Sequence, residues 1–291
     1  MSTSSPIIEN RNGEDAPMSA PTSRVREAGN SSQLGSVIIN ADDWGRYVAN
    51  TDRAKHCFVA GAISSVSAMV FMADSERAAD TARFHKIDTG LHLNFTTPYS
   101  APHCPPRLKE HQQEIARSLS AHRFAGALFH PRLTTSFEYV VKKQLEEYER
   151  LYGAAPARLD GHHHMHLCAN VQCQDLLPQG SIVRRNLTFE RGEKAWLNRL
   201  YRRMQDKRLA RRHRVARYFF DLHPVVPRAR LRQIFELGKR FNVELETHPI
   251  RDEEYRFLMN GEIQRCAEEI RIAVGYALRS HLSVSTEEKF A

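Results

Sequence analysis

The chain has 291 residues, of which 41% are hydrophobic and 26% charged, a composition typical of a folded globular protein rather than a disordered one. It contains no run of about 18 apolar residues, so we expect no membrane span. Its 42 Lys and Arg against 34 Asp and Glu give a net charge of +8, and it has 15 histidines. The positive charge favours a polyanionic partner. The histidine excess favours metal binding or acid–base chemistry.

The N-terminal segment differs in composition from the rest of the chain. Residues 1–35 are rich in Ser, Pro, Asn and Gly and poor in large apolar side chains, which predicts a disordered tail before one domain at 36–291. The tail has no apolar core behind a charged start, so a secretory signal is not expected. The five cysteines form no CxxC pair and are expected to be free thiols of a cytoplasmic protein.

Short apolar runs alternate with amphipathic segments beyond the tail. In chain order we expect a strand at 37–39, a helix at 48–61, a strand at 62–72, a helix at 74–85, a strand at 89–96, a proline-rich loop at 97–112, a helix at 136–152, strands at 157–160 and 217–221, a helix at 228–240, a strand at 243–249 and a helix at about 261–279. Alternating strands and helices favour an α/β fold with a mainly parallel sheet.

Four of these strands end in ionisable residues. The residues are Asp42 with Asp43, then His92, His162 and His248. In parallel α/β sheets and barrels, functional sites form at the carboxyl ends of the strands. We therefore expect these side chains to converge on one rim.

The histidine cluster at 162–166 indicates a metal site. Taken singly, Asp42 and Asp43 could equally cap a turn, and His92 could be structural. In a strand His162, His164 and His166 would share a face, and in a helix His162 and His166 would, so either geometry gathers imidazoles. One carboxylate with two imidazoles leaves metal positions open for water and substrate, which suits hydrolysis of an amide or ester.

Four segments together resemble a known family. NADDWG at 40–45, GLHLNFT at 90–96, LDGHHHMH at 159–166 and ETHP at 246–249 resemble the YdjC-type carbohydrate deacetylases, which include the chitooligosaccharide deacetylases. The resemblance implies a distorted (β/α) TIM-like barrel, related in fold to the polysaccharide deacetylases. It also implies a substrate with an N-acetylated amino sugar, one divalent metal and, often, a homodimer.

The resemblance also implies a role for each site residue. Asp43, His92 and His162 would bind the metal, which the family suggests is Mg²⁺, although the ligand chemistry suits Zn²⁺ as well. Asp42 would be the general base and His248 the general acid. His164 and His166 would line the site or orient ligands, and Trp44 and Asn94 would lie near the substrate. Trp44 departs from the usual Phe, and Arg46-Tyr47 replaces a small or apolar pair.

The positive charge is concentrated in one segment. Residues 184–240 hold 18 Lys and Arg and 5 Asp and Glu, so this segment carries +13 and the remainder −5. It could form a solvated helix, bind a phosphorylated or lipid-linked sugar or an acidic membrane surface, or bind nucleic acid. No nucleic-acid-binding motif is present, so we expect no nucleic-acid partner. A metallohydrolase acting on a lipid-linked or phosphorylated sugar is the main alternative function, and an inactive sugar-binding relative is a further one.

Overall fold

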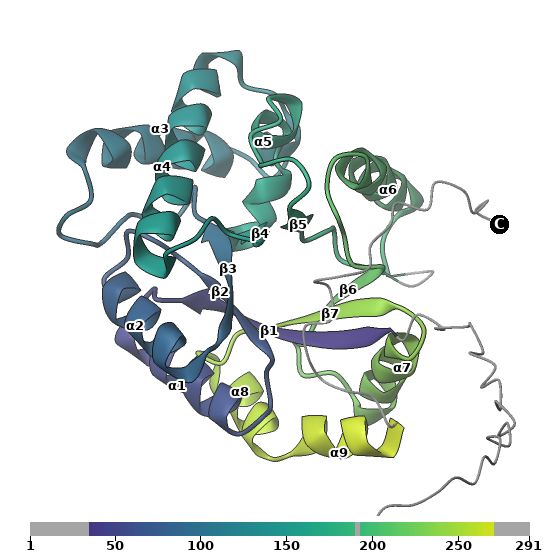
Figure 1. Ribbon diagram of the computed structural model, residues 1–291. Helices are drawn as coiled ribbons and strands as arrows, with labels where there is room; N and C mark the ends of the chain where they lie inside the picture. Colours follow the sequence, from purple (N-terminus) through teal and green to yellow (C-terminus); the bar gives the residue numbers. More distant parts are fainter. Residues whose placement is uncertain (1–34, 190–192, 271–291) are drawn as a thin grey trace, which may run out of the picture. The chain divides into compact units, whose positions relative to one another are not determined.

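The computed structural model describes residues 35–189 and 193–270 (Figure 1). The predicted tail at 1–35 and the predicted helical residues 271–279 thus lie, apart from Gly35, outside the described residues.

The described residues contain a seven-stranded sheet in the order β5-β4-β3-β2-β1-β7-β6, and every pairing is parallel. The strands are β1 (Ser36–Trp44), β2 (Ser65–Ala68), β3 (Asp88–Leu93), β4 (Arg158–Gly161), β5 (Ile182–Val183), β6 (Tyr218–Asp221) and β7 (Asn242–Thr247).

The two edges of the sheet approach each other. The Val183 N–H donates to the Arg214 carbonyl at 2.9 Å, and the Thr188 N–H donates to the Phe219 carbonyl at 2.7 Å. The sheet therefore curls into an incompletely closed barrel, with helices outside it (Figure 1). This confirms the predicted α/β fold and its distorted (β/α) barrel.

The helices follow the strands in the predicted alternation. They are α1 (Val48–Val59), α2 (Ser75–His85), α3 (Pro106–Ser120), α4 (Thr134–Tyr152), α5 (Ala169–Cys173), α6 (Trp196–Ala210), α7 (Arg228–Gly238), α8 (Asp252–Met259) and α9 (Glu262–Ile270), with 3₁₀ turns η1 (Ala125–Ala127), η2 (Pro131–Leu133) and η3 (His162–Leu167). Among the described helices, none combines the length and the apolar character needed to cross a bilayer.

Several predicted boundaries were wrong. The first strand does not end at 39, because β1 continues through the aspartates to Trp44, and the strand expected at 89–96 ends at Leu93. The expected loop at 97–112 ends early because Pro106 occupies the first turn of α3, where its missing N–H costs no helical hydrogen bond. The expected strand at 62–72 is confined to β2, because the chain turns toward α2 after Ala68 and Phe71 has a left-handed φ of 58°. The prolines correctly predicted a loop after residue 96, and the apolar residues correctly predicted a strand after residue 61, but neither showed where the element ends.

The interior of the barrel is polar, and this arrangement supports the site. Alternate strand residues face inward, and the Asn40 side chain donates to Ser67 Oγ at 2.8 Å and accepts from Arg158 at 2.9 Å. A Cβ at Gly90 would lie 2.8 Å from Arg158 Nη1, so glycine leaves the space that this guanidinium fills. The intervening residues are apolar and pack against the helices, as Val66 and Leu91 do.

Candidate active site

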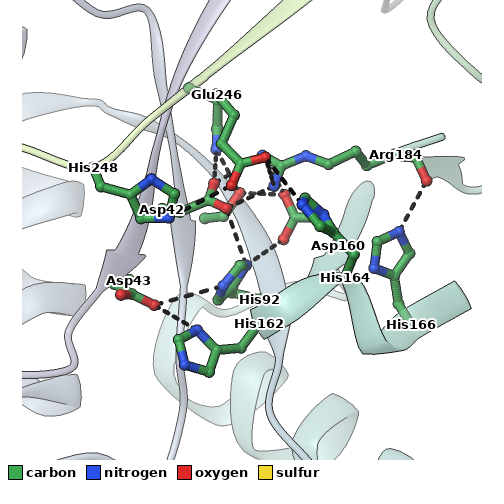
Figure 2. Close-up of polar contacts among 12 residues, drawn as sticks. Asp42, Asp43, His92, Asp160, His162, His164, His166, Arg184, Glu246 and His248 are labelled. Atoms are coloured by element: carbon green, nitrogen blue, oxygen red, sulfur yellow. Dashed lines mark hydrogen bonds and ion pairs between the residues drawn. The ribbon is translucent and has the colours of Figure 1, made fainter. Parts of the chain in front are cut away.

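The four strand ends selected from the sequence meet at one rim of the barrel. Asp42 and Asp43 lie at the end of β1, His92 in β3, His162 directly after β4 and His248 directly after β7 (Figure 2). All the paired strands are parallel, so their carboxyl ends share this edge.

Asp43, His92 and His162 are placed as a set of metal ligands. Asp43 Oδ1 lies 2.9 Å from His162 Nδ1 and 3.6 Å from His92 Nε2. One ligand atom from each residue lies within 4.8 Å of the other two. Two atoms bound about 2.1 Å from one ion are about 3.0 Å apart at right angles and about 3.4 Å apart at the tetrahedral angle. The three side chains therefore fit a divalent ion.

The local backbone directs Asp43 toward this set. The register of β1 against β2 shifts between Ala41 and Trp44, and Asp43 adopts a left-handed φ of 63°. Asp tolerates this region better than most residues, and such a bulge re-aims a side chain. The two adjacent aspartates can therefore serve different partners.

The Asp43 carboxylate is ionised, and one of its oxygens faces the two imidazoles. Burial would raise its pKa, but the hydrogen bond from His162 and the charge of His92 outweigh burial and hold the pKa below its ordinary value. Arg46 Nη1 lies 3.1 Å from Oδ2, which leaves Oδ1 toward His162 and His92. An ionised oxygen that faces two imidazoles is a suitable metal ligand.

Asp42 is held by a buried arginine that sequence reasoning missed. Arg184 Nη1 and Nη2 donate to its two oxygens at 2.6 and 2.8 Å, and Asn40 donates at 2.7 Å. Burial opposes ionisation, but the Arg184 charge keeps the pKa of Asp42 well below its usual value. Asp42 is therefore a fixed, charged carboxylate.

Arg184 belongs to the basic segment 184–240, yet it does not lie on the surface. Its side chain is 1% exposed and also contacts Asp160 at 2.9 Å and Glu244 at 2.7 Å. The guanidinium thus balances the negative charge of carboxylates inside the barrel. In the sequence, no local pattern distinguishes Arg184 from the surface arginines that follow it.

Asp160 fixes the orientation of the His92 ring. Its Oδ1 lies 2.7 Å from His92 Nδ1, which leaves His92 Nε2 toward Asp43. A carboxylate bonded to the second nitrogen of an imidazole fixes the ring and its tautomer. Asp160 lies within the sequence LDGHHHMH, two residues before His162. Because alternate residues of a strand share a face, this spacing could have indicated Asp160 as a further site residue.

His248 pairs with a second residue that was not predicted. Its Nε2 lies 3.5 Å from Glu246 Oε1, and its Nδ1 has no hydrogen-bond partner among the described residues. Burial, together with the nearby Asp42 charge, raises the pKa of Glu246 well above its usual value. Both effects favour the protonated form of Glu246, whose carboxyl lies beside the imidazole. The sequence could have indicated Glu246, because it lies two residues before His248, on the face of β7 that also carries Glu244.

The histidine cluster forms neither a strand nor a regular helix, so neither predicted geometry was right. His163 and His164 have left-handed φ values of 54° and 57° within η3. Burial lowers the pKa of His164 to about 3 and that of His166 to about 4, so both rings are neutral. His164 Nε2 lies 3.7 Å from Glu246, and His166 Nε2 lies 2.9 Å from the Arg184 carbonyl. His166 therefore contacts the backbone of the arginine that holds Asp42.

Trp44 and Asn94 are fully buried behind the rim. The Trp44 indole donates to the Ala78 carbonyl at 3.2 Å and packs in the core. The Asn94 side chain accepts from the Thr96 and Thr97 N–H groups and donates to the Thr97 carbonyl. Both side chains are 0% exposed, so neither offers a surface that a substrate could contact, contrary to the expectation that they lie near it.

A family model described as YdjC-like protein matches residues 36–270. The chain belongs to the YdjC-like family. This confirms the resemblance identified from the four sequence segments.

Two curated relatives are similar to this chain in sequence, and one solved structure is similar to it in fold. The chain is 31% identical over 150 residues to the carbohydrate deacetylase of Mus musculus, covering 47% of this chain and 44% of that protein. It is 28% identical over 138 residues to the chitooligosaccharide deacetylase of Yersinia pestis (strain Pestoides F), covering 46% and 52%. These matches thus span about half the length of the curated relatives.

The solved structure comes from Enterococcus faecalis V583 and is described as that of a candidate cellobiose-phosphate cleavage protein. It matches with a TM-score of 0.58 and 17% identity, over 83% of this chain and 97% of that one. At this identity the likeness concerns the fold alone.

Proposed function

We propose that this YdjC-like protein is a metal-dependent hydrolase that removes the acetyl group from an N-acetylated amino sugar of the chitooligosaccharide type. The observation that carries the proposal is the convergence of Asp43, His92 and His162, with Asp42 and His248 beside them. The names of the two curated relatives point to the same class of reaction.

Asp43, His92 and His162 would hold the metal. Mg²⁺ is expected from the family resemblance, and the mixed oxygen and nitrogen donors also suit Zn²⁺. When bound, the ion would polarise the amide carbonyl and lower the pKa of a water molecule, which a base as weak as Asp42 requires.

Asp42 and His248 would move the protons. Asp42, fixed by Arg184, takes a proton from water as the water oxygen bonds to the acetyl carbon. The carbon–nitrogen bond then breaks, and His248 gives a proton to the departing nitrogen, so that acetate and a free amine leave. Glu246 beside His248 Nε2 would keep the imidazole in place during this transfer.

The test combines acetate release with metal content. Wild-type protein is assayed on N-acetylated mono- and disaccharides with Mg²⁺ or Zn²⁺, and bound metal is measured by mass spectrometry. Asp43→Ala and His162→Ala should lose both metal and activity. Asp42→Asn should keep the metal and lose about 10²–10⁴-fold in rate, the range for a lost general base. His56→Ala, an exposed histidine on α1, is the matched control.

Full metal content in purified Asp43→Ala would overturn the ligand assignment. Including sugars that carry a phosphate or a lipid in the panel tests the alternative substrate class, because acetate would then be released from those sugars alone.

A further inference from the structure

The outer face of α6 exposes a continuous apolar row. Trp196, Leu200 and Met204 recur every four residues and therefore lie one above another on the helix. Leu197 and Tyr201 adjoin them, and the exposed fractions of the five side chains range from 41% at Tyr201 to 65% at Trp196. A surface helix of a globular protein usually turns such a row inward.

The opposite face of α6 holds the helix against the barrel. Leu209 is 1% exposed, and the Gln205 side chain donates to the Leu167 carbonyl at 3.1 Å. Asp206 Oδ2 lies 2.7 Å from Arg185. These contacts fix the rotation of the helix, so the apolar row points away from the body of the protein. Leu167 follows the histidine cluster directly, which places α6 at the end of the barrel that carries the site.

A basic row runs beside the apolar row. Arg203, Lys207 and Arg211 are exposed and share the spacing of four. Residues 196–212 contain seven Lys and Arg and one acidic residue, Asp206, which faces inward. The outer face of α6 is therefore both apolar and cationic.

We propose that α6 docks on a bilayer surface that contains anionic lipids. At 15 residues the helix is about 22 Å long, shorter than the hydrocarbon core of about 30 Å, so it would lie parallel to the surface. Trp196, Leu200 and Met204 enter the boundary between headgroups and acyl chains, while the arginine heads reach the lipid phosphates. This inference goes beyond the proposed deacetylation and does not depend on it.

Two other partners match only half of this face. Nucleic acid would satisfy the basic row but leave Leu197, Leu200 and Met204 without an apolar environment. A second copy of the chain would cover the apolar row but bring two cationic helices together. An anionic bilayer satisfies both rows at once.

The chain carries its own reporter for the test. Of its two tryptophans, Trp44 is fully buried and Trp196 is 65% exposed. Adding vesicles of equal parts phosphatidylglycerol and phosphatidylcholine to the full chain should shift the Trp196 emission to the blue and carry the protein down on sedimentation. Vesicles of phosphatidylcholine alone should do neither. Trp196→Phe should abolish the shift while largely keeping sedimentation.

Four variants separate the two rows from general effects. Removing a cation near an anionic surface weakens binding by about fivefold, so Arg203→Gln with Arg211→Gln should weaken it by about 25-fold. Leu200→Ser should weaken it by about tenfold. Phe84→Ser, an exposed apolar residue on α2, and Arg256→Gln, an exposed arginine on α8, are the matched controls and should change it less than twofold.

Several outcomes would overturn the proposal. These are an unchanged emission with anionic vesicles, vesicle binding that Leu200→Ser leaves intact, and a blue shift that depends on protein concentration without lipid. Salt-sensitive binding to an oligonucleotide in place of vesicles would also overturn it. Acetate release from water-soluble sugars is measured on the same samples and should be unaffected by the α6 variants.

Discussion

Replacing Arg184 with methionine should destabilise the protein severely. The guanidinium is 1% exposed and contacts Asp42, Asp160 and Glu244 at 2.6 to 2.9 Å. Removing one partner of a buried ion pair costs about 3–5 kcal/mol, because the other charge stays buried without compensation. A domain of this size loses about 2–4 °C in Tm per kcal/mol, so we expect a fall of roughly 6–20 °C.

The adjacent arginine provides the control. Arg185 lies 2.7 Å from Asp206, and its side chain is 22% exposed, so Arg185→Met should cost about 1 kcal/mol or less. Both variants are measured by urea unfolding, with Trp44 fluorescence and circular dichroism as probes. Arg184→Lys should recover only part of the loss, because an ammonium group cannot make the paired contacts with Asp42.

The pH dependence identifies the cause. Without Arg184, burial raises the folded-state pKa of the carboxyls above their unfolded values, so the variant should gain stability relative to wild type as the pH falls from about 7 to 5. A free energy of unfolding for Arg184→Met within about 1 kcal/mol of wild type would refute the reasoning.

Two further predictions concern stability. In Gly90→Ala the new Cβ would lie 2.8 Å from the buried Arg158 guanidinium, so we expect a loss of about 1–3 kcal/mol in chemical unfolding. Gly126→Ala, whose Cβ meets Met165 at an ordinary 3.4 Å, should change little, and equal losses would contradict the steric argument. Glu147 has a pKa that burial would raise but that nearby cations lower. Its stabilisation is present above the unfolded pKa of about 4.3 and lost as pH falls through the lower folded value, so Glu147→Gln should flatten the acid limb of the Tm profile.

The amino-acid sequence was enough to predict the fold class and the centre of the candidate site. Alternating strand and helix patterns are local, and they predicted an α/β fold with a mainly parallel sheet, whereas the barrel was implied by the family resemblance. Polar residues after apolar strands marked Asp42, Asp43, His92, His162 and His248, because the carboxyl ends of parallel strands meet at one rim.

The tertiary structure alone decided which charges are paired inside the barrel. Arg184 meets Asp42 across 142 positions, a separation at which no spacing rule operates. Glu246 gains its raised pKa from burial beside Asp42, and both conditions arise only once the strands assemble. Local sequence could not show them.

The tertiary structure also determined which face of α6 is buried. Leu200 and Met204 are spaced as neighbours on one face of a helix, and such a row usually packs inward. In the folded chain Gln205 and Leu209 are the anchored residues, so the apolar row of α6 faces outward. Amphipathic periodicity defines two faces, and only contacts with the barrel decide which one is buried.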